Sequence, residues 1–143
     1  MPNWCQNQVT FTNNNPAVIN EIIFAFEECN LLQHFVPLNE WNCTEAVEKW
    51  GTKWDIKGSE DQFELDDNKV TLWFDSAWAP PIPFYEAMEA RRIRVEAYYY
   101  EPGMCFCGEY NYGVDQRVEY DTFDGIPSNI VEVFGIEDWE SAD

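Results

Sequence analysis

Residues 63–74 read FELDDNKVTLWF, and this stretch decides the fold expected for the chain. Apolar side chains alternate with polar ones on both sides of a short segment rich in Asp and Asn: Phe63, Leu65, Val70, Leu72 and Phe74. Alternation with a period of two is typical of strands that bury one face, and Asp and Asn favour the tight turns that join such strands. The stretch therefore predicts a β-hairpin in the middle of the chain.

A strand and a helix are expected before this hairpin. Residues 8–12 alternate in the same way, with Val9 and Phe11 on one side. Asn15 is a favourable N-cap, and Pro16 suits the first position of a helix. Apolar residues then recur at helical spacing and predict a helix over residues 16–29: Ile19, Ile22, Ile23 and Phe26.

A helix and further strands are expected after the hairpin. A proline-stiffened loop leads to Pro83, which is expected to open the second helix. The alternating residues 93–100 predict a strand, and residues 101–104 predict a type II turn in which Gly103 adopts a positive φ. The remaining segments predict a return strand, another strand and a short acidic helix or extended segment, at 104–112, 116–123 and 128–139.

The order of these elements predicts an α+β domain of the ferredoxin-like, split β-α-β type, with extra C-terminal strands. In this arrangement the sheet is antiparallel and helices cover one of its faces. Residues 31–58 have no clear period and are interpreted as a structured insertion that contains a short helix at 44–50. The chain of 143 residues is expected to form a single domain, 1–143, with an acidic extension at about 118–143. Cover for the other face of the sheet is expected from the insertion or from aromatic residues, namely Trp73, Tyr98 and Tyr100.

A formal net charge of −19 accompanies 45% hydrophobic and 17% aromatic residues. The apolar residues suffice for a core, so the acidic residues are expected on the outside of a folded domain. The charge is one-sided toward the C-terminus, since residues 118–143 contain eight acidic residues and no Lys or Arg. Such a surface repels nucleic acid and anionic membranes and attracts basic proteins. A solvated face without any further role is the simplest alternative.

The sequence shows neither a membrane span nor a secretion signal. No stretch reaches the roughly 20 apolar residues that cross a bilayer. The N-terminal residues, MPNWC, lack the basic and apolar segments of a signal peptide. We therefore expect a cytoplasmic protein that does not bind membranes.

The five cysteines are an odd number and favour reduced thiols over a disulfide framework. A zinc site is the alternative, because Cys105 and Cys107 lie two apart on an expected strand and His34 with Cys29 or Cys43 would complete four ligands. The chain has one histidine and no C-x-x-C motif, so no metal and no cofactor are expected. A nucleophilic pair of Cys29 with His34 is also disfavoured, and no Gly-rich phosphate loop is present. We do not expect an enzyme.

Three segments carry a family resemblance, and we call them the motif segments: residues 1–7 (MPNWCQN), 50–55 (WGTKWD) and 74–83 (FDSAWAPPIP). Together they resemble the YubB ferredoxin-like domain family of bacteriophage and plasmid proteins, with similarity from Met1 to about Gly113. The resemblance implies a ferredoxin-like fold and a phage or mobile-element source, and it brings no established activity or catalytic residues. The acidic end after Val118 lies outside the motif segments, so a role particular to this chain is expected there.

The motif segments also contain four tryptophans that are expected in the core: Trp4, Trp50, Trp54 and Trp78. Lys53 and Asp55 are expected to pair with each other or to cap the end of an element. The alternative interpretation is functional. In it, a small-molecule pocket is lined by Lys53, Trp54, Asp55 and Trp78.

The charge and the phage-like resemblance together lead to a functional hypothesis. Carboxylates on a rigid sheet can imitate the phosphates of a nucleic acid and occupy the basic channel of a nuclease. We expect the chain to bind and inhibit a basic host protein, either a defence nuclease or another nucleic-acid-binding protein, without binding nucleic acid directly. The expected contact residues are Glu119, Asp121, Asp124, Glu132, Glu137, Asp138 and Glu140.

Two alternatives belong to other functional classes. An adaptor or assembly module would meet a partner protein through an aromatic surface, for which the candidates are Trp54, Trp78, Tyr98 and Tyr100. A pocket protein would instead bind a nucleotide or another small ligand. Exposed aromatic residues or an unpaired edge strand would also support a homodimer.

Overall fold

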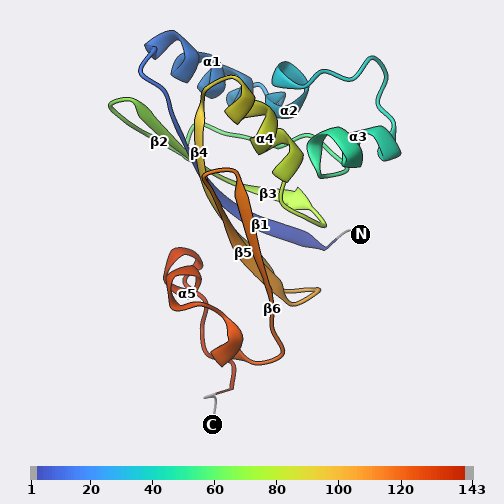
Figure 1. Ribbon diagram of the computed structural model, residues 1–143, viewed down its shortest axis with the longest axis vertical. Helices are drawn as coiled ribbons and strands as arrows, with labels where there is room; N and C mark the ends of the chain where they lie inside the picture. Colours follow the sequence, from blue (N-terminus) through green and yellow to red (C-terminus); the bar gives the residue numbers. More distant parts are fainter. Residues whose placement is uncertain (1–2, 141–143) are drawn as a thin grey trace.

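The computed structural model describes residues 3–140 and contains the predicted order of strands and helices. The elements are β1 (Trp4–Thr12), α1 (Pro16–Glu27), α2 (Leu31–Phe35), α3 (Cys43–Trp50), β2 (Phe63–Asp66), β3 (Lys69–Ala77), α4 (Ile82–Ala90), β4 (Arg94–Glu101), β5 (Phe106–Asn111), β6 (Val114–Glu119), a 3-10 turn (Phe123–Gly125) and α5 (Ser128–Phe134). Figure 1 shows these elements with their labels.

All strand pairs in the described residues are antiparallel, and they form one six-stranded sheet in the order β2-β3-β1-β4-β5-β6. The first four strands in this order, with α1 and α4 as the two connecting helices, form the split β-α-β unit. β5 and β6 extend the sheet beyond β4. The predicted fold class, ferredoxin-like with extra C-terminal strands, is confirmed.

Helix α1 begins where the sequence indicates. The side chain of Asn15 accepts a hydrogen bond from the backbone N–H of Ala17 at 3.0 Å, and Pro16 follows this cap as the first helical residue. The helix ends at Glu27 rather than at residue 29, because Cys29 turns the chain with a φ of 56°. Its buried side chains are Ile19, Ile22, Ala25 and Phe26.

The main core lies between the sheet and the layer formed by α1 and α4. The predicted hairpin is present, with Asp66 opposite Lys69 at its turn. Phe11 of β1 makes edge-on ring contacts with Phe84 and Tyr85 of α4, with 6.4 Å between ring centroids in each pair. The alternating apolar residues of β1 and β3 therefore bury their side chains against these two helices.

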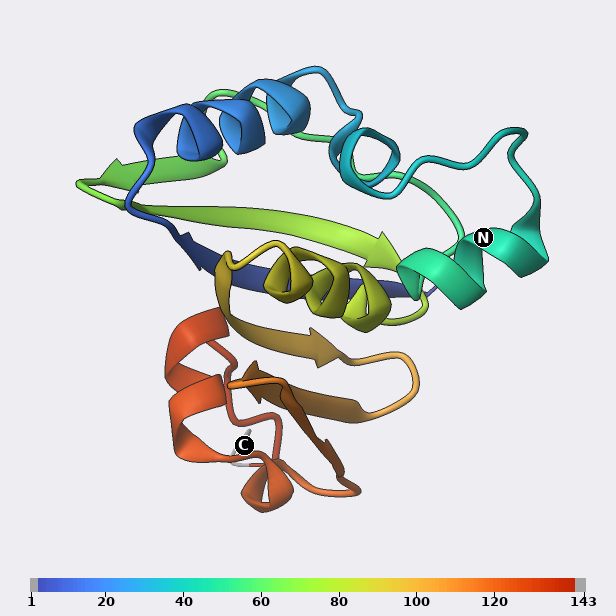
Figure 2. The ribbon, with the colours of Figure 1, turned by 45° about the horizontal axis from the view of Figure 1, so that its top comes forward.

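The insertion at 31–58 extends this helix layer and does not cover the opposite face of the sheet. Leu31 and Leu32 of α2 and Trp50 of α3 are buried in the main core. Figure 2 shows α2 and α3 continuing the layer of α1 and α4 along the sheet. The insertion therefore does not cover the second face, contrary to one of the two expectations. Helix α2 was not predicted, because its five residues are too few to show a helical period.

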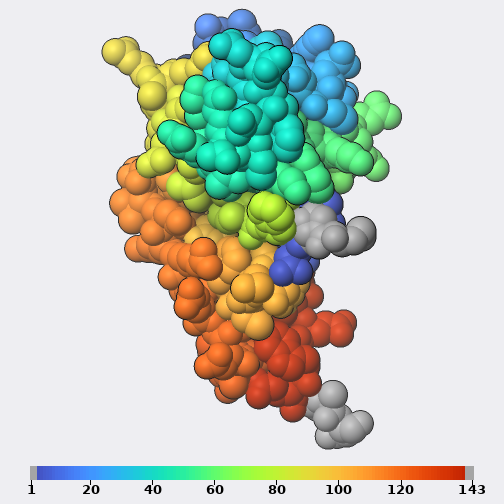
Figure 3. All heavy atoms as spheres, turned by 90° about the vertical axis from the view of Figure 1, so that its right-hand side faces the viewer, coloured from blue at the N-terminus to red at the C-terminus, as the bar shows by residue number. Residues whose placement is uncertain are grey.

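Part of the second face is covered by the C-terminal extension. Helix α5 and the preceding turn pack on β4 and β5 around a second, smaller cluster of buried residues: Cys107, Tyr120, Ile126 and Ile130. The side chains of Tyr98 and Tyr100 pack against this cluster. The extension is therefore a folded layer, and it forms one end of the molecule, away from α1 to α4 (Figures 1 and 3).

The turn between β4 and β5 differs from the predicted type II turn. Cys105 has the positive φ, 58°, and Gly103 does not have one. The buried carboxylate of Glu101 accepts hydrogen bonds from the N–H groups of Gly103 at 2.5 Å and Met104 at 2.9 Å, and these bonds shape the turn. A Cβ atom on residue 103 would lie 2.7 Å from Cγ of Asn3, so a larger residue there would require the side chain of Asn3 to move.

Candidate functional site

One half of the second sheet face is left open by the extension. In this half, Gln6 of β1 lies opposite Asp75 of β3, and Gln8 lies opposite Trp73. These side chains point away from α1 and α4, because their neighbours in sequence are the buried ones. The indole N–H of Trp73 donates to Oε1 of Gln8 at 2.8 Å, which fixes this pair across the strands.

The three motif segments meet at the end of this open face. The hydroxyl of Thr52 donates to the carbonyl of Ala77 at 2.8 Å, which joins the second segment to the third. The side-chain amide of Asn7 donates to Oγ of Ser76 at 2.9 Å, which joins the first to the third. Both bonds are buried, so they position the exposed residues of the same segments.

Three of the four tryptophans in the motif segments are exposed, which corrects the expectation that all four lie in the core. Trp50 is 3% exposed, whereas Trp4, Trp54 and Trp78 are 43%, 39% and 44% exposed. The physical reason is their position. Trp4 begins β1 on the face that lacks helices, and Trp54 and Trp78 lie in loops, the latter with a φ of 69°.

The exposed tryptophans form a cluster around Lys53. The rings of Trp4 and Trp54 are 6.1 Å apart between centroids and tilted by 40°. The ammonium nitrogen of Lys53 lies 4.6 Å from the ring centroid of Trp54 and 4.9 Å from that of Trp78. Lys53 therefore holds the two indoles through cation–π contacts and does not pair with Asp55.

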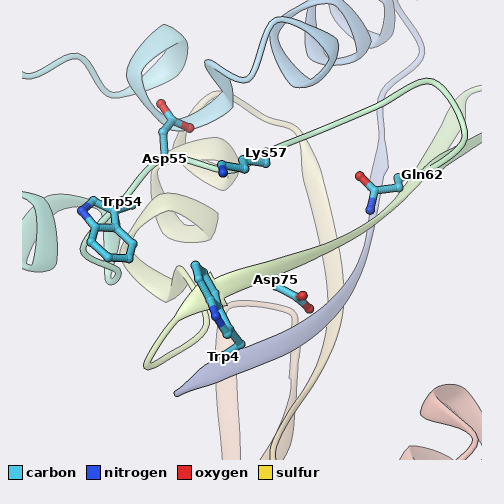
Figure 4. Close-up of a pocket in the computed structure, with 6 residues that line it drawn as sticks. All are labelled: Trp4, Trp54, Asp55, Lys57, Gln62 and Asp75. Carbon is cyan, nitrogen blue, oxygen red and sulfur yellow. The ribbon is translucent and has the colours of Figure 1, made fainter. Parts of the chain in front are cut away.

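Beside this cluster is a pocket of about 460 Å³, which is within the size range of small-ligand sites. Figure 4 shows its lining: Trp4, Trp54, Asp55, Lys57, Gln62 and Asp75. Of the four residues in the pocket hypothesis, Trp54 and Asp55 line this pocket, whereas Lys53 and Trp78 are not among its lining residues. Lys57, Gln62 and Asp75 were not predicted, because they come from separate segments and no local pattern links them.

The two aspartates of the pocket differ in what they can do. Asp55 accepts hydrogen bonds from the N–H groups of Leu32, Gln33 and Ile56 at 2.8, 2.9 and 2.8 Å, so it caps the start of α2. Burial raises the pKa of Asp55 even though these three bonds lower it. Shielding by neighbouring protein atoms likewise raises the pKa of Asp75, whose carboxylate has no hydrogen-bond or ion-pair partner within the described part of the chain.

The predicted acidic residues are on the surface of the extension. Five of them have exposed carboxylates that bond to no backbone group, although Glu119 lies 3.7 Å from the guanidinium of Arg117: Glu119, Asp121, Asp124, Glu132 and Glu137. The other two have structural contacts, since Glu140 accepts from the N–H of Phe123 at 2.6 Å and Asp138 accepts from the N–H of Glu140 at 2.9 Å. Five of the seven predicted carboxylates are therefore available to a partner protein, whereas Asp138 and Glu140 stabilise the C-terminal end of the extension.

Tyr98 and Tyr100 do not form an open aromatic platform. Both are half-buried because the extension packs on them. Tyr100 stacks on Tyr120 with 6.4 Å between ring centroids and lies 6.0 Å from the ring of Phe134. An adaptor surface built on these two tyrosines would first require the extension to move away.

Within the described part of the chain, the cysteines and His34 are not brought together as a zinc site or as a nucleophilic pair. Within residues 3–140, no group of three or more His, Cys, Asp or Glu side chains is arranged to hold a metal ion. Cys105 is exposed in the turn while Cys107 is buried in β5, where burial raises its pKa to about 11. The ring of His34 forms a hydrogen bond with the carboxylate of Glu21 at 2.7 Å. The thiol of Cys29 instead donates to the carbonyl of Gly58 at 3.6 Å, so Cys29 and His34 do not pair. No described helix has the length and apolar character needed to span a bilayer.

Comparison with known proteins adds one match. The sequence model of a family described as a ferredoxin-like domain in Api92-like protein matches residues 49–140, which is more than half of the chain. The match includes the acidic extension, which is therefore part of the domain that this family shares. No curated protein and no solved structure matches the chain.

Proposed function

This chain belongs to the family of ferredoxin-like domains in Api92-like proteins, and from this premise we propose that it is a non-catalytic protein whose acidic extension binds a basic protein. The resemblance to YubB proteins adds a biological context to this proposal. In that setting the chain has a phage or plasmid origin and acts in the cytoplasm of the host cell. Its partner there is a host defence nuclease or another nucleic-acid-binding protein, which it inhibits.

The observation that carries the proposal is the fixed surface on which the extension displays its carboxylates. Ile126 and Ile130 are buried beneath it, and Tyr120 lies 6.1 Å from the ring of Trp139, so the segment is anchored along its length. No Lys or Arg follows Arg117 in the sequence. A preorganised array of like charges binds without first losing chain entropy, which a flexible acidic tail would have to lose.

The mechanism that we propose is mimicry of nucleic acid. The exposed carboxylates occupy the positions of phosphates in the basic channel of the partner. Attraction between opposite charges speeds association and is screened over about 8 Å at 0.15 M salt. The complex should therefore dissociate as the salt concentration rises.

The test compares two variants with equal charge. The extension variant replaces five exposed acids by their amides: Glu119→Gln, Asp121→Asn, Asp124→Asn, Glu132→Gln and Glu137→Gln. The helix-layer variant replaces five exposed acids elsewhere: Glu27→Gln, Glu28→Gln, Glu40→Gln, Glu48→Gln and Glu60→Gln. Each set changes the formal net charge from −19 to −14.

Tagged forms of both variants and of the wild type are used to capture proteins from bacterial lysate, with washes at low salt and at about 0.5 M salt. We expect a basic nucleic-acid-binding protein that elutes with salt, is retained by the helix-layer variant and is lost with the extension variant. The purified partner should then lose its binding to DNA or RNA when the wild type is added. Equal loss in both variants, or capture that resists salt, would contradict the proposal.

A further inference from the structure

The pocket beside the tryptophan cluster is lined by three exposed polar side chains that are available to a ligand. Within residues 3–140, the side chains of Lys57, Gln62 and Asp75 have neither a hydrogen bond nor an ion pair with another residue. Figure 4 shows them arranged around the same pocket, with Lys57 coming from the loop before β2 and Asp75 from β3. Asp55, the other carboxylate of the pocket, already accepts hydrogen bonds from three N–H donors. Several free polar groups that converge on one pocket are typical of a ligand site.

The walls of the pocket are suited to a flat ring. Trp4 and Trp54 are both partly exposed, and their rings meet at an angle of 40°. Lys53 packs over the ring of Trp54, which limits its movement before any ligand arrives. Planar heterocycles gain affinity by stacking on such rings, and this contact is independent of charge. A planar ligand is therefore favoured over a flexible one.

The hydrogen-bonding properties of these three polar side chains indicate which planar base would fit the pocket. The carboxylate of Asp75 only accepts hydrogen bonds, and two oxygens in one plane match two neighbouring N–H donors. Lys57 only donates, and Gln62 both donates and accepts. Guanine has the complementary set, with neighbouring N–H donors on one edge and the acceptors O6 and N7 on the other. Adenine would place a ring acceptor against the carboxylate.

We propose that this pocket binds the guanine base of a free nucleoside or mononucleotide, stacked on Trp4 and Trp54 and held by Asp75 at its N–H edge. Lys57 and Gln62 contact the acceptor edge of the base. This site is on the open half of the second face, apart from the acidic extension. It is independent of the protein-binding function proposed above.

The net charge of the chain favours a base from a free nucleoside or mononucleotide over a base that is part of a nucleic acid. A chain with a net charge of −19 opposes every phosphate that approaches it, and the penalty grows with the number of phosphates. A single phosphate, or none, meets the least repulsion. Guanosine and guanosine monophosphate are therefore the probes of choice.

The experiment measures binding of guanosine, guanosine monophosphate and the matching adenine compounds by calorimetry, with quenching of tryptophan fluorescence as a second readout. We expect both guanine compounds to bind, with affinity at least about fivefold higher than that of the adenine compounds. Absence of binding by the guanine compounds overturns the proposal, and so does equal binding of adenine. A single-stranded oligonucleotide that binds more tightly than the monophosphate overturns the assignment to a free nucleotide.

Two variants and one control locate the site. Asp75→Asn should weaken guanine binding at least about fivefold and should not weaken adenine binding, because only guanine uses the carboxylate and an amide can pair with adenine. Trp54→Ala should weaken both by a similar factor, because stacking does not distinguish the bases. Glu64→Gln removes an equal charge from the neighbouring strand β2 outside the pocket and should have no effect. Circular dichroism confirms that each variant is folded, and guanine binding that survives Asp75→Asn in full contradicts the site.

Discussion

The carboxylate of Asp55 accepts a hydrogen bond from the backbone N–H of Leu32, with 2.8 Å between the two atoms. It also accepts one from the N–H of Gln33 at 2.9 Å, so a single side chain connects the second motif segment to the start of α2. We predict that Asp55→Ala lowers the free energy of unfolding by about 1–3 kcal/mol, because donors in a partly buried helix start lose their acceptor. Urea unfolding followed by tryptophan fluorescence measures the change. Asp55→Asn keeps one acceptor and should cost less.

Glu60→Ala is the control for this prediction, since Glu60 is exposed and its carboxylate has no hydrogen bond or ion pair within residues 3–140. It removes a carboxylate from the same loop region without removing a cap. If Asp55→Ala costs no more than Glu60→Ala, the cap does not stabilise the insertion.

The extension is predicted to unfold more readily than the rest of the domain. Its buried cluster is small and separate from the main core, and Ile130 is 2% exposed within it. Ile130→Ala should lower stability by about 2–4 kcal/mol locally, because it leaves a cavity under α5. Hydrogen exchange should then speed up in residues 120–134 while the amides of β1 and α1 keep their protection. Val114→Ala, at an exposed position of β6, should change neither.

An equal increase of exchange throughout the sheet would show instead that the extension and the main core unfold together. In that case Ile130→Ala would lower the midpoint of the whole unfolding transition. The wild-type exchange pattern provides the reference, since β4 contacts both clusters through its two faces.

The hairpin and α1 were predictable from the sequence because their signals are local. Val70, Leu72 and Phe74 alternate within one strand, and Asn15 with Pro16 marks a helix start without any knowledge of the rest of the chain. The ferredoxin-like order follows from these elements. Helix α2 is too short for periodicity, and Asp55, which caps it, is more than twenty residues away in sequence.

The site was only partly predictable, since burial of a tryptophan depends on the face to which it points. Trp50 and Trp54 are close in sequence, yet one is in the core and the other lines the pocket. Nothing in the local pattern indicated that α5 would cover Tyr98 while leaving Asp75 open. Which half of the second face is covered depends on tertiary packing, because the extension contacts Tyr98 and Tyr100 and not the opposite half.

Asp75→Asn is predicted to change how stability depends on pH. Shielding by the surrounding protein raises the pKa of Asp75 in the folded state above its usual value of 3.8. The folded protein therefore holds this proton more tightly than the unfolded chain does. The stability that this group contributes is present below pH 3.8 and is lost as the pH rises through the raised pKa.

Asp75→Asn removes the carboxyl group and therefore the cost of keeping it ionised in the folded protein. The variant should be slightly more stable than the wild type at neutral pH. The difference should shrink as the pH falls toward the usual aspartate value. Urea unfolding of both proteins at a series of pH values measures this difference, with Glu64→Gln as an exposed control. A wild type that gains stability over Asp75→Asn as the pH rises would mean that the pKa is lowered.

Salt is predicted to stabilise the folded protein, because repulsion among its surface carboxylates opposes folding. The sequence has 27 acidic residues against eight Lys and Arg, and the ion pairs that form are exposed, such as Lys49 with Glu45 at 3.0 Å and Arg94 with Glu96 at 2.6 Å. Exposed pairs contribute about 0–1 kcal/mol each, so screening them costs little, whereas screening the excess of negative charge is favourable. The thermal midpoint should therefore rise between about 0.02 M and 0.5 M sodium chloride.

The two charge variants show where this repulsion is concentrated. Both have a formal net charge of −14, obtained by removing five of the charges that make up −19. Because residues after Arg117 include no base to offset the carboxylates, the extension variant should start from a higher midpoint at low salt and gain less from added salt than the helix-layer variant. Differential scanning calorimetry at both salt concentrations measures the two slopes. Equal slopes would show that the repulsion is spread over the whole surface, and a midpoint that falls with salt would show that the ion pairs outweigh it.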